Sequence, residues 1–104
     1  MNFMTIDLSG QQQLLTVRLS GELDHFTTAK IKEAVEDELV RTGARNIAFD
    51  FSGVTFMDSS GIGMVLGRYK TVSSLGGKII LFGMTAETER IMKMSGIDRI
   101  AEIY

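Results

Sequence analysis

The residues with the clearest chemical potential lie between Asp58 and Gly63, where the chain reads Asp-Ser-Ser-Gly-Ile-Gly. Asp58, Ser59 and Ser60 are all favourable residues for the start of a helix, because their side-chain oxygens accept hydrogen bonds from free backbone N–H groups. A purely structural role as a helix cap would therefore explain these three residues by itself.

A second role is indicated by the glycines Gly61 and Gly63 that follow in the first turn. Each costs a helix up to about 1 kcal/mol relative to alanine, and the missing side chains expose backbone that another molecule could approach closely. A helix start also carries partial positive charge, so a phosphate on Ser59 or Ser60 would be tolerated there. The pattern favours a binding or phosphorylation site without choosing between the two serines.

Catalytic alternatives have weaker support. A serine nucleophile needs a base, and His25 is the only histidine in the chain. A hydrolase using Ser59 and His25 stays open, but the Gly-x-Ser-x-Gly pattern of hydrolases is missing, because Met57 and Gly61 flank Asp-Ser-Ser. The phosphate-binding Gly-Lys-Ser/Thr loop is also missing. A single histidine without cysteine predicts no transition-metal site, and we expect no cofactor.

Composition narrows the class of protein further. The 104 residues predict a single domain over residues 1–104. A net charge of −2 without any run of Lys or Arg argues against direct nucleic-acid binding. The longest apolar run, Ile79 to Phe82, is far shorter than the ~20 residues of a membrane span. With no cysteine and no secretory signal, the expected location is the cytoplasm.

The periodicity of apolar residues predicts an α/β fold. Strands are expected at about 4–8, 15–19, 46–51, 78–82 and 100–104, and helices at about 27–43, 60–75 and 85–96. The order β-β-α-β-α-β-α-β predicts a mixed, mainly parallel sheet with an antiparallel first strand. Ser20-Gly21 should close the second strand, and a polar turn should cover residues 11–13.

The central helix should face the core with Ile62, Val65, Leu66, Tyr69 and Val72. Its start follows a parallel strand, and sites of open α/β sheets form at the carboxyl ends of such strands. His25, in the loop expected after the second strand, could lie at the same sheet edge as Ser59.

Four segments resemble the STAS family, the anti-sigma factor antagonists of bacteria, and within it the sporulation branch. They are Gly21-Glu22-Leu23-Asp24-His25, Asp58-Ser59-Ser60-Gly61-Ile62-Gly63, Leu66-Gly67-Arg68-Tyr69-Lys70 and Met94-Ser95-Gly96. The segments occur in the family's order and span most of the chain, so together they are specific.

The resemblance implies a partner-switching regulator of transcription that is not an enzyme. The unphosphorylated protein would bind an anti-sigma factor with serine kinase activity and so free a sigma factor. Phosphorylation at Ser59 would release the complex, and a PP2C-type phosphatase would reset it. The alternative is a STAS module that senses a nucleotide or another small ligand.

The resemblance also implies a binding surface. The residues concerned are Glu22, Asp24, Asp58, Ser59, Ser60, Gly61, Ile62, Gly63 and Arg68. Ile62 could instead belong to the core. Arg68 lies nine residues beyond Ser59, roughly 13 Å along a helix, so we expect it to contact a partner or solvent rather than a phosphate on Ser59.

Overall fold

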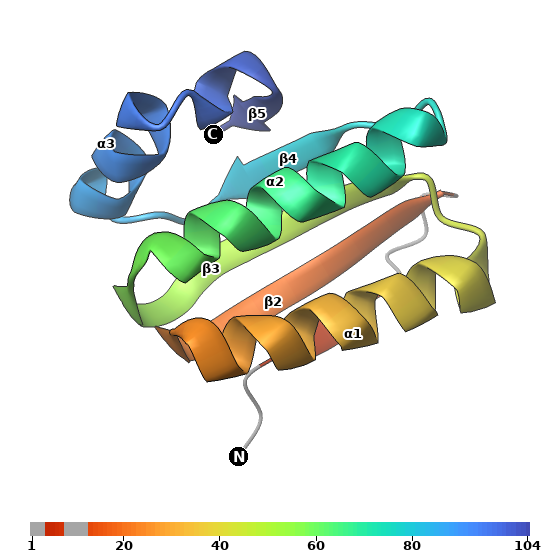
Figure 1. Cartoon of the computed structure of the whole chain (residues 1–104), viewed down its shortest axis with the longest axis horizontal. Helices are drawn as coiled ribbons and strands as arrows, with labels where there is room; N and C mark the ends of the chain where they lie inside the picture. The colour runs from red at the N-terminus through yellow and green to blue at the C-terminus, as the bar shows by residue number, and fades with distance from the viewer. Residues whose placement is uncertain (1–3, 8–12) are drawn as a thin grey trace.

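The computed structural model of the protein describes residues 4–7 and 13–104. Three helices and a short 3-10 turn accompany a five-stranded sheet (Figure 1). The strands are β1 (Met4–Asp7), β2 (Leu14–Leu23), β3 (Asn46–Met57), β4 (Ile79–Phe82) and β5 (Ala101–Ile103). The helices are α1 (His25–Thr42), α2 (Ser59–Ser74) and α3 (Ala86–Met94), followed by η1 (Ile97–Arg99). The predicted order of strands and helices is confirmed, apart from the added 3-10 turn.

The strands lie in the order β1-β2-β3-β4-β5. The pairs β2–β3, β3–β4 and β4–β5 are parallel, whereas β1 pairs antiparallel with β2. This arrangement agrees with the mixed sheet expected from the sequence. Helices α1 and α2 lie side by side over one face of the sheet, and α3 lies towards the β4–β5 edge (Figure 1).

The core forms between this sheet face and the two long helices. Its buried apolar side chains include Leu15, Val17, Leu19 and Leu23 of β2, Ile47, Phe49 and Phe51 of β3, Ile31, Val35 and Leu39 of α1, and Met64, Val65 and Val72 of α2. Each fully buried side chain of this size contributes roughly 1.5–3 kcal/mol. Burial of the helix pair on the sheet therefore fixes where the ends of both helices lie.

The predicted ends of two strands are wrong. Ser20-Gly21 does not close β2, which continues to Leu23, and β3 continues six residues past Phe51 to Met57. The two strands stay paired because irregularities after Arg18 and Gly21 absorb the local mismatch, and Gly21 has a φ of 78° there. The expected strand residue Leu8 and turn residues 11–12 lie outside the described residues.

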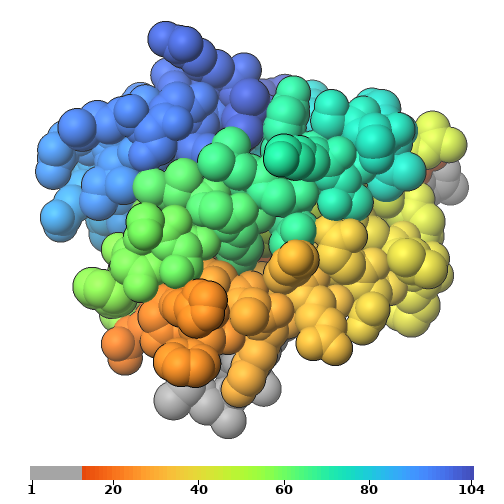
Figure 2. Space-filling view, in the orientation of Figure 1, coloured from red at the N-terminus to blue at the C-terminus, as the bar shows by residue number. Residues whose placement is uncertain are grey.

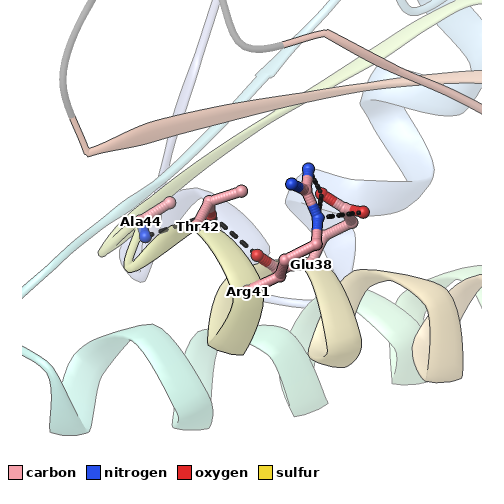
Figure 3. A network of polar contacts seen from close by, with 4 residues as sticks. All are labelled: Glu38, Arg41, Thr42 and Ala44. Carbon is pink, nitrogen blue, oxygen red and sulfur yellow. Dashed lines mark hydrogen bonds and ion pairs between the residues drawn. The ribbon is translucent and has the colours of Figure 1, made fainter.

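Helix α1 ends in a polar network (Figure 3). The Arg41 guanidinium lies 2.6 Å from the Glu38 carboxylate, and the Thr42 hydroxyl donates to the Glu38 carbonyl at 2.7 Å. The Ala44 N–H donates in turn to the Thr42 hydroxyl at 3.2 Å. Gly43 adopts a φ of 73°, which confirms the predicted left-handed helix cap.

The connection from α2 to β4 is packed against the connection from α1 to β3. A β-carbon on Gly77 would lie 1.6 Å from the carbonyl oxygen of Arg45, so only glycine fits there. The Lys78 N–H donates to the Asn46 side chain at 2.9 Å, and the Asn46 N–H donates to the Gln13 carbonyl at 2.9 Å. These contacts join three loops at the end of the sheet remote from Ser59.

The third helix follows the sequence prediction closely. Thr85 caps it by accepting a hydrogen bond from the Thr88 N–H at 3.1 Å. Glu89 and Lys93 form the predicted pair on the exposed side, with 2.8 Å between their charged atoms.

Candidate functional site

Ser59 is the first residue of α2, and its side chain is exposed. Its hydroxyl has no hydrogen-bond partner among the described residues. Asp58 is the helix cap: its Oδ1 accepts a hydrogen bond from the Ser60 N–H at 2.7 Å. The structural role predicted for this segment is therefore carried out by Asp58, which leaves both serine hydroxyls available.

The parallel pairing of β2 with β3 brings the two motif segments together. Glu22 lies opposite Phe56 and Leu23 opposite Met57 in the ladder, and the Asp58 N–H donates to the Leu23 carbonyl at 3.2 Å. Because both strands run directly into helices, the starts of α1 and α2 lie at one edge of the sheet (Figure 1).

Asp24 caps α1 as Asp58 caps α2. Its Oδ1 accepts from the Thr27 N–H at 2.9 Å, and the Asp24 N–H donates to the Thr27 hydroxyl at 2.9 Å. The Thr27 hydroxyl also donates to the Glu22 carbonyl at 2.7 Å. Two hydrogen bonds from Thr27 lower the pKa of Asp24, and the one from the Thr27 backbone has a larger effect than the one from its side chain. Asp24 is half-buried and serves as the N-terminal cap of α1, whereas the Glu22 side chain is exposed.

The two glycines of the motif occupy different environments. Gly61 is buried, and a β-carbon there would lie 2.5 Å from the Cγ and Sδ atoms of Met57. The expectation that Gly61 exposes backbone to another molecule is therefore wrong, because the close neighbour is the chain itself. Gly63 is exposed, with no atom within 4 Å of such a β-carbon, so its backbone is open.

The predicted inward side of α2 is confirmed at Val65 and Val72 and is wrong at Leu66. Its buried residues are Gly61, Met64, Val65, Arg68 and Val72. Leu66, expected to face inward, is 41% exposed, while Ile62 and Tyr69 are half-buried and pack on the core. The spacing of 61, 65, 68 and 72 is helical, and hydrophobic periodicity identified Val65 and Val72 but missed Gly61 and Arg68, which are not hydrophobic side chains.

Arg68 is neither a surface residue nor an exposed partner contact, contrary to both sequence expectations. Its side chain is 6% exposed, and its Nε lies 2.7 Å from Oε2 of Glu36 on α1. The Thr71 hydroxyl donates to the same carboxylate oxygen at 2.9 Å. Glu36 lies 32 residues earlier on another helix, so no local pattern revealed the pair.

Sequence reasoning missed two exposed aromatic residues beside the motif. Phe26, in the first turn of α1, is 76% exposed, and Phe56, just before the start of α2, is 53% exposed. The strand register brings Phe56 to the same sheet edge as Glu22 and the start of α1. Large exposed aromatic side chains near a helix start are typical of protein interfaces.

The structure offers no support for the hydrolase alternative. His25 is the first residue of α1, not a loop residue, and its ring lies 5.8 Å from that of Phe26. It makes no hydrogen bond to Ser59 in the described chain. Within residues 4–7 and 13–104, no group of three or more candidate ligands could hold a metal ion. No helix in the same residues has the length and apolar character that crossing a bilayer requires.

Comparison with known proteins gives a consistent result. Residues 5–104 match the STAS domain family. The chain is 35% identical over 101 residues to the anti-sigma F factor antagonist of Paenibacillus polymyxa, which covers 97% of this chain and 86% of that protein. It is 32% identical over 89 residues to an anti-sigma-B factor antagonist of Listeria monocytogenes, covering 86% of this chain and 77% of that protein.

Solved structures of SpoIIAA share the fold. The structure of the Bacillus cell fate determinant SpoIIAA in the phosphorylated form has a TM-score of 0.77 and 26% identity, covering 97% of this chain and 90% of that one. The anti-sigma factor antagonist SpoIIAA in its unphosphorylated form has a TM-score of 0.79 at 24% identity, covering 97% and 86%. These relatives are named for acting on another protein rather than for a reaction.

Proposed function

The chain belongs to the STAS domain family, and we propose that it acts as an anti-sigma factor antagonist controlled by phosphorylation of Ser59. The observation that carries this proposal is the position of Ser59, which is exposed at the first residue of α2. Its hydroxyl makes no hydrogen bond within residues 4–7 and 13–104. The names of the two antagonist relatives, each at least 30% identical to this chain, supply the class of partner.

In this role the unphosphorylated protein binds an anti-sigma factor that is also a serine kinase, and the bound sigma factor is released. The kinase transfers a phosphoryl group from ATP to the Ser59 hydroxyl, and a PP2C-type phosphatase removes it. The relative SpoIIAA occurs in phosphorylated and unphosphorylated forms, which supports such a cycle. This role belongs to the cytoplasm, where bacterial transcription takes place, and the F-type relative favours a sporulation pathway.

The proposed interface combines apolar anchors with a polar centre. Phe26 in the first turn of α1 and Phe56 near the end of β3 provide exposed aromatic surface, and Gly63 provides open backbone on α2. Ser59 and Glu22 add exposed polar groups at the same end of the sheet. Aromatic anchors around a polar group favour tight binding only while that group can be desolvated cheaply.

Phosphorylation changes that cost without threatening the fold. It adds about −1.5 to −2 charge beside the carboxylate of Asp58. In the free protein the start of α2 offsets part of the charge, by about 0.3–1 kcal/mol. In the complex the same charge must leave water, and a loss of about 3 kcal/mol would weaken binding by about two orders of magnitude. The modification therefore acts on the complex while the free protein stays folded.

The modification is tested by peptide mass spectrometry after incubation with the cognate anti-sigma kinase and ATP. We expect one phosphate on Ser59, none on Ser59→Ala, and normal modification of Ser60→Ala as the matched control. Phosphate on Ser60, or no phosphate with an active kinase, would contradict the proposal.

Binding to the anti-sigma factor tests the switch separately from the chemistry. Ser59→Ala should bind as the unmodified protein does and remain bound in the presence of ATP. Ser59→Asp should bind less tightly, with Ser60→Asp as the positional control. Equal affinities for Ser59→Ala and Ser59→Asp by calorimetry would exclude a charge-sensitive position at Ser59.

A further inference from the structure

A groove of about 300 Å³ lies between the first halves of α1 and α2. Figure 2 shows these two helices side by side on one face of the molecule. The groove is open because small residues line it: Ala29 on α1, and Gly63 and Gly67 one turn apart on α2. No atom lies within 4 Å of a β-carbon built on either glycine, so neither glycine is needed for packing within the described chain.

The polar groups that line the groove are mainly cationic or donors. They comprise His25, Thr28 and Lys32 on α1 and Ser60 and Arg68 on α2, and no carboxylate is among the lining residues. Neither Lys32 nor the Ser60 hydroxyl has an ion-pair or hydrogen-bond partner in residues 4–7 and 13–104. The groove therefore offers unused positive charge and an unused hydroxyl donor.

Arg68 supplies the observation that points to a ligand. The residue is 5% exposed, its Nε faces Glu36 at 2.7 Å, and its buried Nη1 has no hydrogen-bond partner among the described residues. The ion pair with Glu36 balances the charge of the guanidinium, but neither the buried Nε nor the buried Nη1 donates a hydrogen bond within the described residues. Buried charged donors are nearly always paired, since leaving one unpaired costs 1–3 kcal/mol or more. Arg68 also lines the groove, so a ligand with acceptor oxygens bound there is a candidate partner for this side chain.

We propose that this groove binds a small ligand through a phosphate-class oxyanion, either free phosphate or a small phosphate monoester. A tetrahedral dianion has enough oxygens to accept hydrogen bonds from Arg68, Lys32 and Ser60 together. Such charge-assisted hydrogen bonds are stronger than those between neutral groups. The volume exceeds what one phosphate fills, so an attached organic group would lie along Gly63 and Gly67. The groove shares Gly63 with the proposed anti-sigma interface, but ligand binding to it requires no partner protein.

The test is a titration of the 104-residue chain, followed by the amide and arginine Nε–H resonances in ¹H–¹⁵N NMR spectra. One arm uses inorganic phosphate and a second uses glycerol phosphate, each against sodium chloride at matched ionic strength. We expect saturable shifts of the Arg68 Nε–H and of the amides of Ser60, Gly63 and Gly67. Saturation by both probes, tighter for the ester, identifies a monoester ligand, and saturation by phosphate alone identifies free phosphate.

Three variants separate a built site from diffuse charge. Lys32→Gln should weaken binding about two- to fivefold, as expected for one partly exposed charge. Lys30→Gln removes an exposed lysine of the same helix that does not line the groove, and it should leave the affinity unchanged. Gly67→Leu fills the groove and should abolish saturation, with remote amides confirming the fold. Linear shifts, or equal effects of the two lysine variants, would overturn the proposal.

Discussion

The two ends of the α1–α2 pair use glycine for opposite reasons. At the end remote from Ser59, Gly43 and Gly76 adopt φ values of 73° and 78°, and Gly77 lies against the Arg45 carbonyl. Each of these glycines is required by the local backbone. At the Ser59 end, Gly63 and Gly67 lie inside a helix with open space around them. The local backbone explains Gly43, Gly76 and Gly77, whereas no contact within the described chain requires Gly63 or Gly67. A functional reason is therefore needed for Gly63 and Gly67.

The largest effect should come from the packed end. In Gly77→Ala the added methyl group would lie 1.6 Å from the Arg45 carbonyl oxygen, so the loop must move. We expect a loss of unfolding free energy of about 3 kcal/mol or more, measured by urea denaturation. Gly67→Ala is the matched control and should not destabilise the protein. A loss below 1 kcal/mol for Gly77→Ala would show that the two ends do not differ in this way.

A smaller loss of unfolding free energy is expected when the Glu36–Arg68 ion pair, which lies between the two ends, is broken. Glu36→Gln would leave the buried guanidinium without its charge partner. Since the Glu36 side chain is 35% exposed, we expect about 1–2 kcal/mol, less than for a fully buried pair. The double variant Glu36→Gln/Arg68→Met should recover part of the loss. Chemical denaturation of Glu36→Gln, Arg68→Met and the double variant measures the coupling, and strictly additive losses would mean that the pair is not coupled.

The cap at the Ser59 end should be worth about 1 kcal/mol. Asp58→Ala removes the acceptor of the Ser60 N–H, whereas Asp58→Asn keeps an acceptor without the charge. We expect only Asp58→Ala to lower the free energy of unfolding. If the two variants lose the same stability, the charge of Asp58 matters rather than its hydrogen bond.

We expect Gly63→Ala to raise the free energy of unfolding, in contrast to the variants above. Alanine in a helix is favoured over glycine by about 0.5–1 kcal/mol, and the position has room for a methyl group. The variant should therefore be more stable than the natural protein in urea denaturation while binding the anti-sigma factor more weakly. A variant that is both more stable and equally active would remove the functional explanation for Gly63.

The smallest effect is the pH dependence contributed by Asp24. Its pKa in the folded protein is lowered by the hydrogen bonds from Thr27, so its stabilisation is present above the unfolded-state pKa of about 4 and is lost as pH falls. Asp24→Asn should make the fall in unfolding free energy between about pH 5 and pH 3 shallower. Some dependence should remain, because Asp50 also has a lowered pKa. An unchanged slope would mean that the cap is equally formed by the protonated acid.

Much of the architecture could be predicted from sequence, because alternating and helical periodicity are local signals. The helix caps at Gly43 and Thr85 and the Glu89–Lys93 pair follow from residues within a few positions of each other. The geometry of the site was harder to predict from the sequence. The extended ends of β2 and β3 and the pairing of Arg68 with Glu36 depend on contacts across elements, which single-sequence patterns do not carry.

The paired stretches of β2 and β3 differ in length. From the Leu14–Asn46 pair to the Leu23–Met57 pair, β2 advances nine residues and β3 eleven, and two irregularities absorb the difference. A shift of one residue turns every following side chain to the opposite face of a strand. A single residue inserted into or deleted from either strand would therefore turn the following side chains to the opposite face. The length of β3 thus sets which residue begins α2.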